Sequence, residues 1–204
     1  MKTFKTLLLG LCIVMCACST QTPRQTNEYG TNWQWENGTI VIETPERPAG
    51  QKSVLGLTVP KMEVVRVGFV GLGMRGPGAV ERFTHIPGTQ VVALCDYEQS
   101  RAERCQKYLK KASMPKAAIY SGEKGYEELC KRDDIDLVYI AADWLHHFPV
   151  AKYALENGKH VAIEVPSAMN LQQCWDLINM SEKYRKHCMI LELSLIHISE
   201  PTRP

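Results

Sequence analysis

The chain has 204 residues, of which 45% are hydrophobic and 23% are charged, and its formal net charge is +2. This length is enough for one globular domain with appended segments. A net charge so close to zero gives no electrostatic basis for binding nucleic acid, so we expect no such partner.

An export signal is predicted at the N-terminus. Lys2 and Lys5 supply positive charge, and the apolar stretch LLLGLCIVM over 7–15 is too short to span a bilayer as a stable helix. The following MCACS is similar to a bacterial lipobox, with Met15 where leucine is usual. We therefore expect 1–18 to act as a lipoprotein signal, with lipidation at Cys18 anchoring the protein in the membrane of the cell envelope. A plain secretory signal cut nearby is the alternative, and either one places the protein outside the cytoplasm.

Residues 19–61 are predicted to form a tether and lead-in, because asparagine, glycine and proline recur along them. Only Thr39–Ile42 has the character of a short strand. Trp33 and Trp35 stand out in this polar segment. They either dock on another part of the protein or are incidental.

The stretch VVRVGFVGLGMRGPG over 64–78 predicts a strand, a glycine turn and a helix in direct succession. In a dinucleotide-binding turn, Gly71 makes the tight bend, Gly73 lets the backbone approach a pyrophosphate, and Gly76 lets the helix pack closely on the strand. Free N–H groups and the positive end of the helix dipole then face phosphate. The alternative is that these glycines are purely structural.

An acidic residue stands at the distance that this turn requires. Asp96 lies twenty positions beyond Gly76 and ends the apolar run VVALC. A carboxylate there accepts hydrogen bonds from the adenosine ribose and repels a 2′-phosphate, so we expect NAD as the cofactor in preference to NADP. The alternative for Asp96 is a solvated carboxylate at a strand end.

Strands and helices continue to alternate, which predicts a doubly wound parallel α/β sheet of the Rossmann type over 62–192. A helix closed by Asn157 and Gly158 and a helix capped by Asn170 are the clearest boundaries. The expected elements are helices over 99–111, 126–132, 147–156 and from 171, and strands over 117–120, 136–141, 160–164 and 188–192. The last of these helices is expected to bury Leu171, Cys174, Trp175 and Ile178.

The cysteines outside the signal predict neither a disulfide framework nor a metal site. They are odd in number, form no CxxC pair and have no metal-ligand spacing with histidine. We expect them to be small core residues: Cys95, Cys105, Cys130, Cys174 and Cys188.

Ligands of such sheets bind at the carboxyl ends of the strands, where ADWLHH over 142–147 and EVP over 164–166 are expected to lie. Together with GLGMRG and Cys95-Asp96, these motifs resemble the Gfo/Idh/MocA superfamily, and within it glycoside hydrolase family 109, the NAD-dependent α-N-acetylgalactosaminidases. The resemblance implies these cofactor contacts: Met74 and Arg75 at the pyrophosphate, Asp96 at the adenosine ribose, Trp144, Leu145, His146 and His147 at the middle, and Glu164 and Val165 at the nicotinamide half. Alternatively, the histidines are polar residues that start a helix, and Glu164 is a strand-end carboxylate.

Val165 is a departure with consequences for mechanism. Sugar dehydrogenases of the superfamily carry lysine at this position, and valine can neither exchange a proton nor bear a charge. The resemblance to family 109 instead implies transient oxidation at C3 of the sugar, elimination of the glycosidic bond, addition of water and return of the hydride. NAD is then regenerated in every turnover, which suits an exported protein.

The stretch LSLIHISEPTRP over 193–204 resembles a translated sequencing adapter, so we expect it to be non-native and the chain to be an N-terminal fragment. A genuine short tail is the alternative. The resemblance implies that the catalytic residues and the site for an α-N-acetylgalactosamine glycan lie in a second domain, so the fragment is expected to be inactive. The other hypotheses are a sugar oxidoreductase and a non-catalytic NAD-binding surface protein.

Overall fold

The computed structural model describes residues 25–26, 32–42 and 44–192. The predicted signal over 1–18, its lipidation site Cys18 and the tail over 193–204 lie outside these described residues. Within the described ranges, no helix combines the length and the apolar character needed to cross a membrane.

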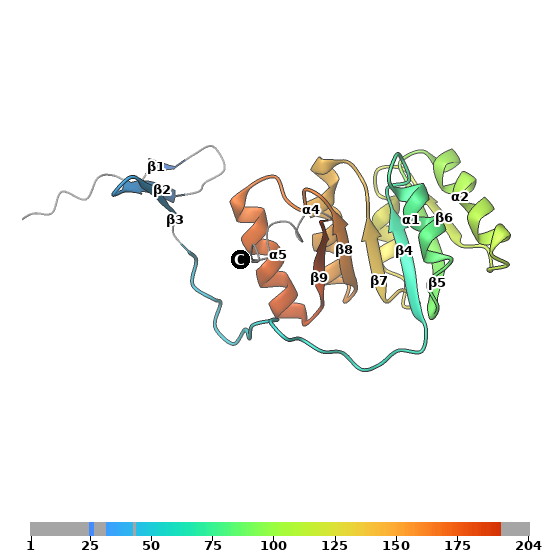
Figure 1. Ribbon diagram of the computed structural model, residues 1–204, viewed down its shortest axis with the longest axis horizontal. Helices are drawn as coiled ribbons and strands as arrows, with labels where there is room; N and C mark the ends of the chain where they lie inside the picture. Colours follow the sequence, from blue (N-terminus) through green and yellow to red (C-terminus); the bar gives the residue numbers. More distant parts are fainter. Residues whose placement is uncertain (1–24, 27–31, 43, 193–204) are drawn as a thin grey trace, which may run out of the picture.

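A six-stranded parallel sheet forms the centre of the molecule, as the alternating pattern predicted (Figure 1). Its spatial order is β6-β5-β4-β7-β8-β9, with every neighbouring pair parallel. The strands are β4 (Val65–Val70), β5 (Thr89–Asp96), β6 (Ala118–Ser121), β7 (Leu137–Ile140), β8 (His160–Glu164) and β9 (Cys188–Leu191). The chain builds outward from β4 in one direction and then, from β7, in the other. This reversal creates the crevice in which doubly wound sheets bind their ligands.

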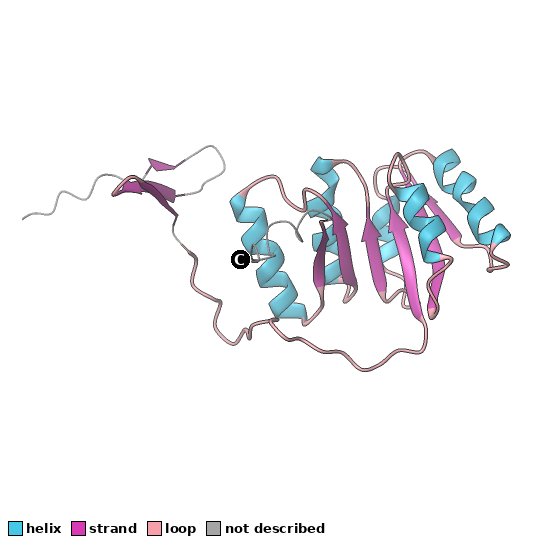
Figure 2. Ribbon diagram, viewed as in Figure 1, coloured by secondary structure: helices cyan, strands magenta, loops and turns pink. Residues whose placement is uncertain are grey.

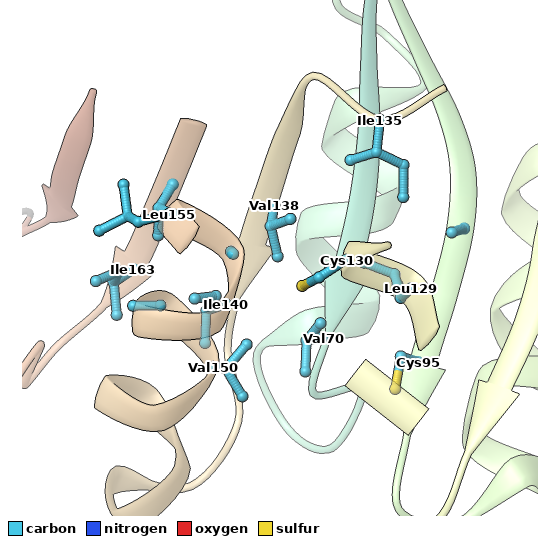
Figure 3. Packing of buried hydrophobic residues seen from close by; sticks show 14 of the residues in the cluster. Val70, Cys95, Leu129, Cys130, Ile135, Val138, Ile140, Val150, Leu155 and Ile163 are labelled. Atoms are coloured by element: carbon cyan, nitrogen blue, oxygen red, sulfur yellow. The ribbon is translucent and has the colours of Figure 1, made fainter. Parts of the chain in front are cut away.

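Helices cover both faces of the sheet (Figure 2), and each face has its own hydrophobic core. The helices are α1 (Gly76–Phe83), α2 (Gln99–Lys111), α3 (Gly125–Cys130), α4 (Trp144–Glu156) and α5 (Leu171–Tyr184). One core joins α1 and α2 to the strands through Val80, Leu94 and Leu109. The other joins α3, α4 and α5 through residues such as Leu129 and Leu155 (Figure 3). Burial on both faces explains why the strands are almost continuously apolar.

Helix α3 spans Gly125–Cys130 where 126–132 was expected, and two further helices differ in ways that have a structural cause. Helix α4 begins at Trp144, three residues earlier than expected, because the side chain of Asp143 accepts a hydrogen bond from the main-chain N–H of Leu145 at 3.0 Å and caps the helix there. Helix α5 is capped by Asn170 as predicted, but it buries Leu177 and the residues one turn further on.

The predicted inner face of α5 is therefore wrong. Cys174 is exposed and so is Ile178, at 44%, while Leu171 and Trp175 are only half-buried. The helix lies at the edge of the sheet and packs mainly against α4, so only a narrow stripe is covered. Of the predicted core cysteines, Cys174 is the clear exception, because Cys95, Cys105 and Cys130 are buried and Cys188 is half-buried.

The lead-in contains a small antiparallel sheet that was only partly predicted. Strand β3 (Thr39–Ile42) was expected, whereas β2 (Asn32–Glu36) and β1 (Gln25–Thr26) were not. The signal for the β2–β3 hairpin was present in Asn37-Gly38, both of which have positive φ. Its register places Trp33 opposite Ile42 and Trp35 opposite Ile40, with the two indole rings 6.5 Å apart.

The remainder of the lead-in is fastened to the last helix. Arg47 Nε donates to the buried carboxylate of Glu182 at 2.9 Å, and Arg185 donates to the carbonyl oxygens of Lys52 and Ser53 at 2.6 and 3.0 Å. From there the segment runs beneath the sheet to the start of β4 (Figure 1). These contacts lie at the end of α5 that is remote from the carboxyl ends of the strands.

Candidate cofactor site

A cavity of about 650 Å³ opens at the carboxyl ends of the central strands, where the predicted site residues meet. It contains every predicted cofactor residue except Gly76 and Leu145. The predicted residues that line it are Gly71, Gly73, Met74, Arg75, Asp96, Trp144, His146, His147, Glu164 and Val165. A volume of this size is in the range of small-molecule and cofactor sites.

Two glycines of the turn are required by backbone geometry. Gly71 has a φ of +91°, and a Cβ there would lie 2.3 Å from the main-chain nitrogen of Ala142. A Cβ at Gly76 would lie 2.0 Å from the carbonyl oxygen of Gly71, so helix α1 can begin this close to the turn only with glycine. Gly76 thus shapes the site from behind and does not line it.

The start of α1 presents unpaired donors to the cavity. The helix has no side-chain cap and no acidic residue in its first turn. The main-chain N–H groups of Gly73, Met74 and Arg75 have no acceptor in the described part of the chain. Together with the helix dipole and the Arg75 guanidinium, these amides form a site suited to an anion such as a pyrophosphate.

Asp96 is held rigidly at the end of β5 and is only 6% exposed. Its Oδ2 accepts the N–H of Leu72 at 2.6 Å and its Oδ1 accepts the N–H of Glu98 at 3.0 Å. The alternative interpretation of Asp96 as a solvated carboxylate is therefore wrong. Each carboxylate oxygen has a second lone pair, so the group can still accept a ribose hydroxyl at the wall of the cavity.

The structure adds residues to this end of the cavity that the sequence analysis did not identify. They come from the loop after β5, from α2, from the β6–α3 connection and from the first turn of α3: Tyr97, Arg101, Gly122, Glu123 and Tyr126. The β6–α3 loop could have been found, because β6 ends at the same edge of the sheet as β4 and β5. No motif spacing marks the other three side chains.

The start of α4 contributes the middle of the cavity. Asp143 caps this helix and its Oδ2 lies 2.6 Å from Nδ1 of His146. Trp144 is 61% exposed and lines the cavity, whereas Leu145 is 72% exposed and does not. Leu145 therefore points away from the place that the family resemblance implied for it.

His147 is the most buried polar side chain of the site, at 1% exposure. Its Nδ1 lies 2.7 Å from the carbonyl oxygen of Pro166. A carbonyl oxygen can only accept, so Nδ1 carries a proton, and in the neutral imidazole Nε2 is then an acceptor. Among the described residues Nε2 has no partner. A buried acceptor without a partner is costly, and a ligand donor in the cavity would satisfy it.

Glu164 is oriented by a buried tyrosine from the neighbouring strand. The hydroxyl of Tyr139 donates to Glu164 Oε1 at 2.7 Å. Burial and then this carboxylate raise the pKa of Tyr139 to about 12, so the tyrosine remains a donor at neutral pH. Val165 follows at 37% exposure and places an apolar group beside the carboxylate. The described residues hold no cluster that could bind a metal ion.

Comparison with known proteins agrees with this geometry. Residues 65–191 match the Gfo/Idh/MocA family, described as an oxidoreductase family with an NAD-binding Rossmann fold. Among solved structures, the myo-inositol dehydrogenase of Lactobacillus casei in complex with NAD(H) and myo-inositol is 26% identical, with a TM-score of 0.51 over 58% of this chain and 33% of that one. Biliverdin reductase from Synechocystis, in complex with biliverdin and NADP+, is 25% identical, with a TM-score of 0.55 over 65% and 39%.

Curated relatives are far more similar in sequence. Glycosyl hydrolase family 109 protein 5 of Phocaeicola vulgatus is 80% identical over 195 residues, which are 94% of this chain and 38% of the relative. Glycosyl hydrolase family 109 protein 1 of Bacteroides thetaiotaomicron is 56% identical over 94% of this chain and 39% of the relative. The chain thus spans well under half the length of these relatives.

Proposed function

We propose that this chain, which belongs to the Gfo/Idh/MocA oxidoreductase family, is the NAD-binding part of a glycosidase. The glycosidase proposed is exported and acts on α-N-acetylgalactosaminides. The observation that carries this proposal is the 80% identity, over 94% of the chain, to a protein named as a family 109 glycosyl hydrolase. The chain spans 38% of that relative, so the activity proposed is that of the longer protein.

Different residues of the cavity suit different parts of the cofactor. The free amides of Gly73, Met74 and Arg75 suit the pyrophosphate, and the clamped carboxylate of Asp96 suits the hydroxyls of the adenosine ribose. The Nε2 atom of His147 is available to a donor from the middle of the cofactor. Glu164, which Tyr139 orients, lies at the end proposed for the nicotinamide half.

When bound, NAD supplies a reversible acceptor for a hydride of the sugar. Because the hydride is returned, the sugar is not oxidised overall, and the net reaction is hydrolysis. Val165 cannot carry a proton, and Tyr139 is held protonated by burial and by Glu164. The role that we assign to this chain is therefore to hold and orient the cofactor. We assign proton transfer at the sugar to residues outside 25–192.

The proposal includes export and a lipid anchor at Cys18, which place the protein in the bacterial cell envelope. A cofactor that is restored in each turnover needs no supply of fresh NAD outside the cytoplasm. This agreement between the apolar Val165 and the predicted export signal supports hydrolysis over net oxidation.

The test is to incubate the longer protein, loaded with NAD, with an aryl α-N-acetylgalactosaminide. We expect release of the aryl alcohol without accumulation of NADH. Steady accumulation of NADH with sugar would instead establish a sugar oxidoreductase. The 204-residue chain should bind NAD but show no turnover, and turnover by this chain alone would overturn our placement of the catalytic groups.

A further inference from the structure

A charged cluster lies at the adenosine end of the cavity, next to Asp96. Arg101 Nη2 donates to Glu98 Oε1 at 2.9 Å, and Arg101 Nη1 lies 3.6 Å from Asp96 Oδ1. The main-chain N–H of Glu98 donates to the same Asp96 oxygen, and the N–H of Arg101 donates to the carbonyl oxygen of Glu98 at 3.0 Å. Hydrogen bonds therefore join Asp96 to Glu98 and Glu98 to Arg101, and a longer ion pair joins Arg101 to Asp96, at the start of α2.

The position of this guanidinium raises a question of selectivity. A Cβ at Gly73 would lie 3.7 Å from Arg101 Nη1, so the cation is between the glycine turn and the ribose carboxylate. Arginine near the ribose is the group that commonly accommodates the 2′-phosphate of NADP. Among the described lining residues, Arg75 and Arg101 are the only arginines or lysines, and Arg101 is the one paired with Asp96.

We propose that Glu98 is a second determinant of cofactor selectivity, because it engages Arg101 and withholds this cation from a 2′-phosphate. The inference rests on the NAD-binding function of the site. With two carboxylates around one guanidinium, the cluster has a net negative charge that disfavours NADP. Asp96 alone would leave Arg101 only partly compensated, at a separation too long for a direct hydrogen bond.

The expected change in NADP affinity depends on how exposed the side chains of Arg101 and Glu98 are to solvent. The side chains of Arg101 and Glu98 are 38% and 54% exposed, so solvent screens their interaction. An exposed pair of this kind changes an equilibrium by up to about fivefold. Asp96, which is buried, remains the stronger determinant.

The experiment measures the dissociation constants of NAD and NADP for the 204-residue chain and for Glu98→Gln by titration calorimetry. Glutamine keeps the length of the side chain and removes its charge. We expect the affinity for NADP to rise about fivefold and that for NAD to change by less than about twofold, with the gain shrinking at high salt. Glu103→Gln is the matched control, because Glu103 is an exposed acid of the same helix that pairs with Gln99 instead of Arg101.

The double variant Glu98→Gln/Arg101→Gln tests whether the effect passes through Arg101. The gain in NADP affinity should vanish in this background. An unchanged NAD to NADP ratio in Glu98→Gln, an equal gain in Glu103→Gln, or a gain that persists without Arg101 would each overturn the inference. If the unaltered chain binds neither nucleotide, the NAD-binding function itself is refuted.

Discussion

Replacing His160 with asparagine should remove a loss of stability that the protein otherwise undergoes between pH 6.5 and pH 4. His160 begins β8, and its Nδ1 accepts the main-chain N–H of His187 at 3.0 Å. Burial, then the charges of Lys186 and His187, lowers the pKa of His160 from 6.5 to about 4, against an opposing effect of Asp136. Protonation would turn Nδ1 from an acceptor into a donor that faces another donor, so the folded state resists it.

The magnitude follows from proton linkage. Because the pKa of His160 is lower in the folded state, the unfolded chain takes up the proton first as pH falls. The stabilisation is complete above pH 6.5 and is lost progressively down to pH 4. The difference between the two pKa values corresponds to about 3 kcal/mol, of which about 2 kcal/mol is lost by pH 5.

The assay is urea unfolding followed by circular dichroism at pH 7 and at pH 5. His160→Asn keeps an acceptor for the N–H of His187, because the Asn Oδ1 can occupy the position of Nδ1. The unaltered chain should lose about 2 kcal/mol more of its free energy of unfolding between these pH values than His160→Asn does. The exposed His85 provides the control, and His85→Asn should behave like the unaltered chain. An equal loss in His160→Asn would refute the assignment of this pH dependence to His160.

Three further outcomes are expected. Gly76→Ala should weaken NAD binding by about a hundredfold or more, because its Cβ would lie 2.0 Å from a carbonyl oxygen of the turn. Gly78→Ala in the same helix should bind NAD normally and gain about 0.5 kcal/mol of stability. Equal NAD affinities of the two variants would contradict this interpretation of the turn. Tyr139→Phe should lose about 1 kcal/mol in the free energy of unfolding and weaken NAD binding, since the carboxylate of Glu164 loses its orienting donor; binding at unaltered affinity would remove Glu164 from the site. Leu129→Ala should lower the free energy of unfolding by about 2–5 kcal/mol, measured by urea unfolding, because Leu129 is fully buried in the core between the sheet and helices α3, α4 and α5. A loss below about 1 kcal/mol would show that this core is loosely packed.

The glycine turn and its acid could be predicted because their signal is local. Gly71 is required by its own φ of +91°, and Gly76 by the carbonyl oxygen of Gly71 within the same turn, 2.0 Å from where a Cβ would lie. Asp96 was identified from its distance along the chain. Its Oδ1 is bound locally by the amide of Glu98, two residues on, whereas only the fold brings the amide of Leu72 to its Oδ2.

The prediction for α5 was wrong for a related reason. Helical spacing correctly placed Leu171 and Cys174 on one side of the helix, but spacing alone does not say which side meets the protein. The position of α5 at the sheet edge, against α4, left Cys174 and Ile178 exposed and buried Leu177. Periodicity therefore located the helix without orienting it.

Sequence by itself determined the α/β class, the glycine turn, the acid at Asp96 and the family, because each depends on short spacings or on backbone sterics. Only the tertiary structure decided what surrounds them: the amide of Leu72 at Asp96, Tyr139 beside Glu164, and the unpartnered Nε2 of His147. The physical reason is the parallel register of the sheet. It gathers the ends of strands that lie tens of residues apart in sequence at one edge, and no local pattern encodes which side chains meet there.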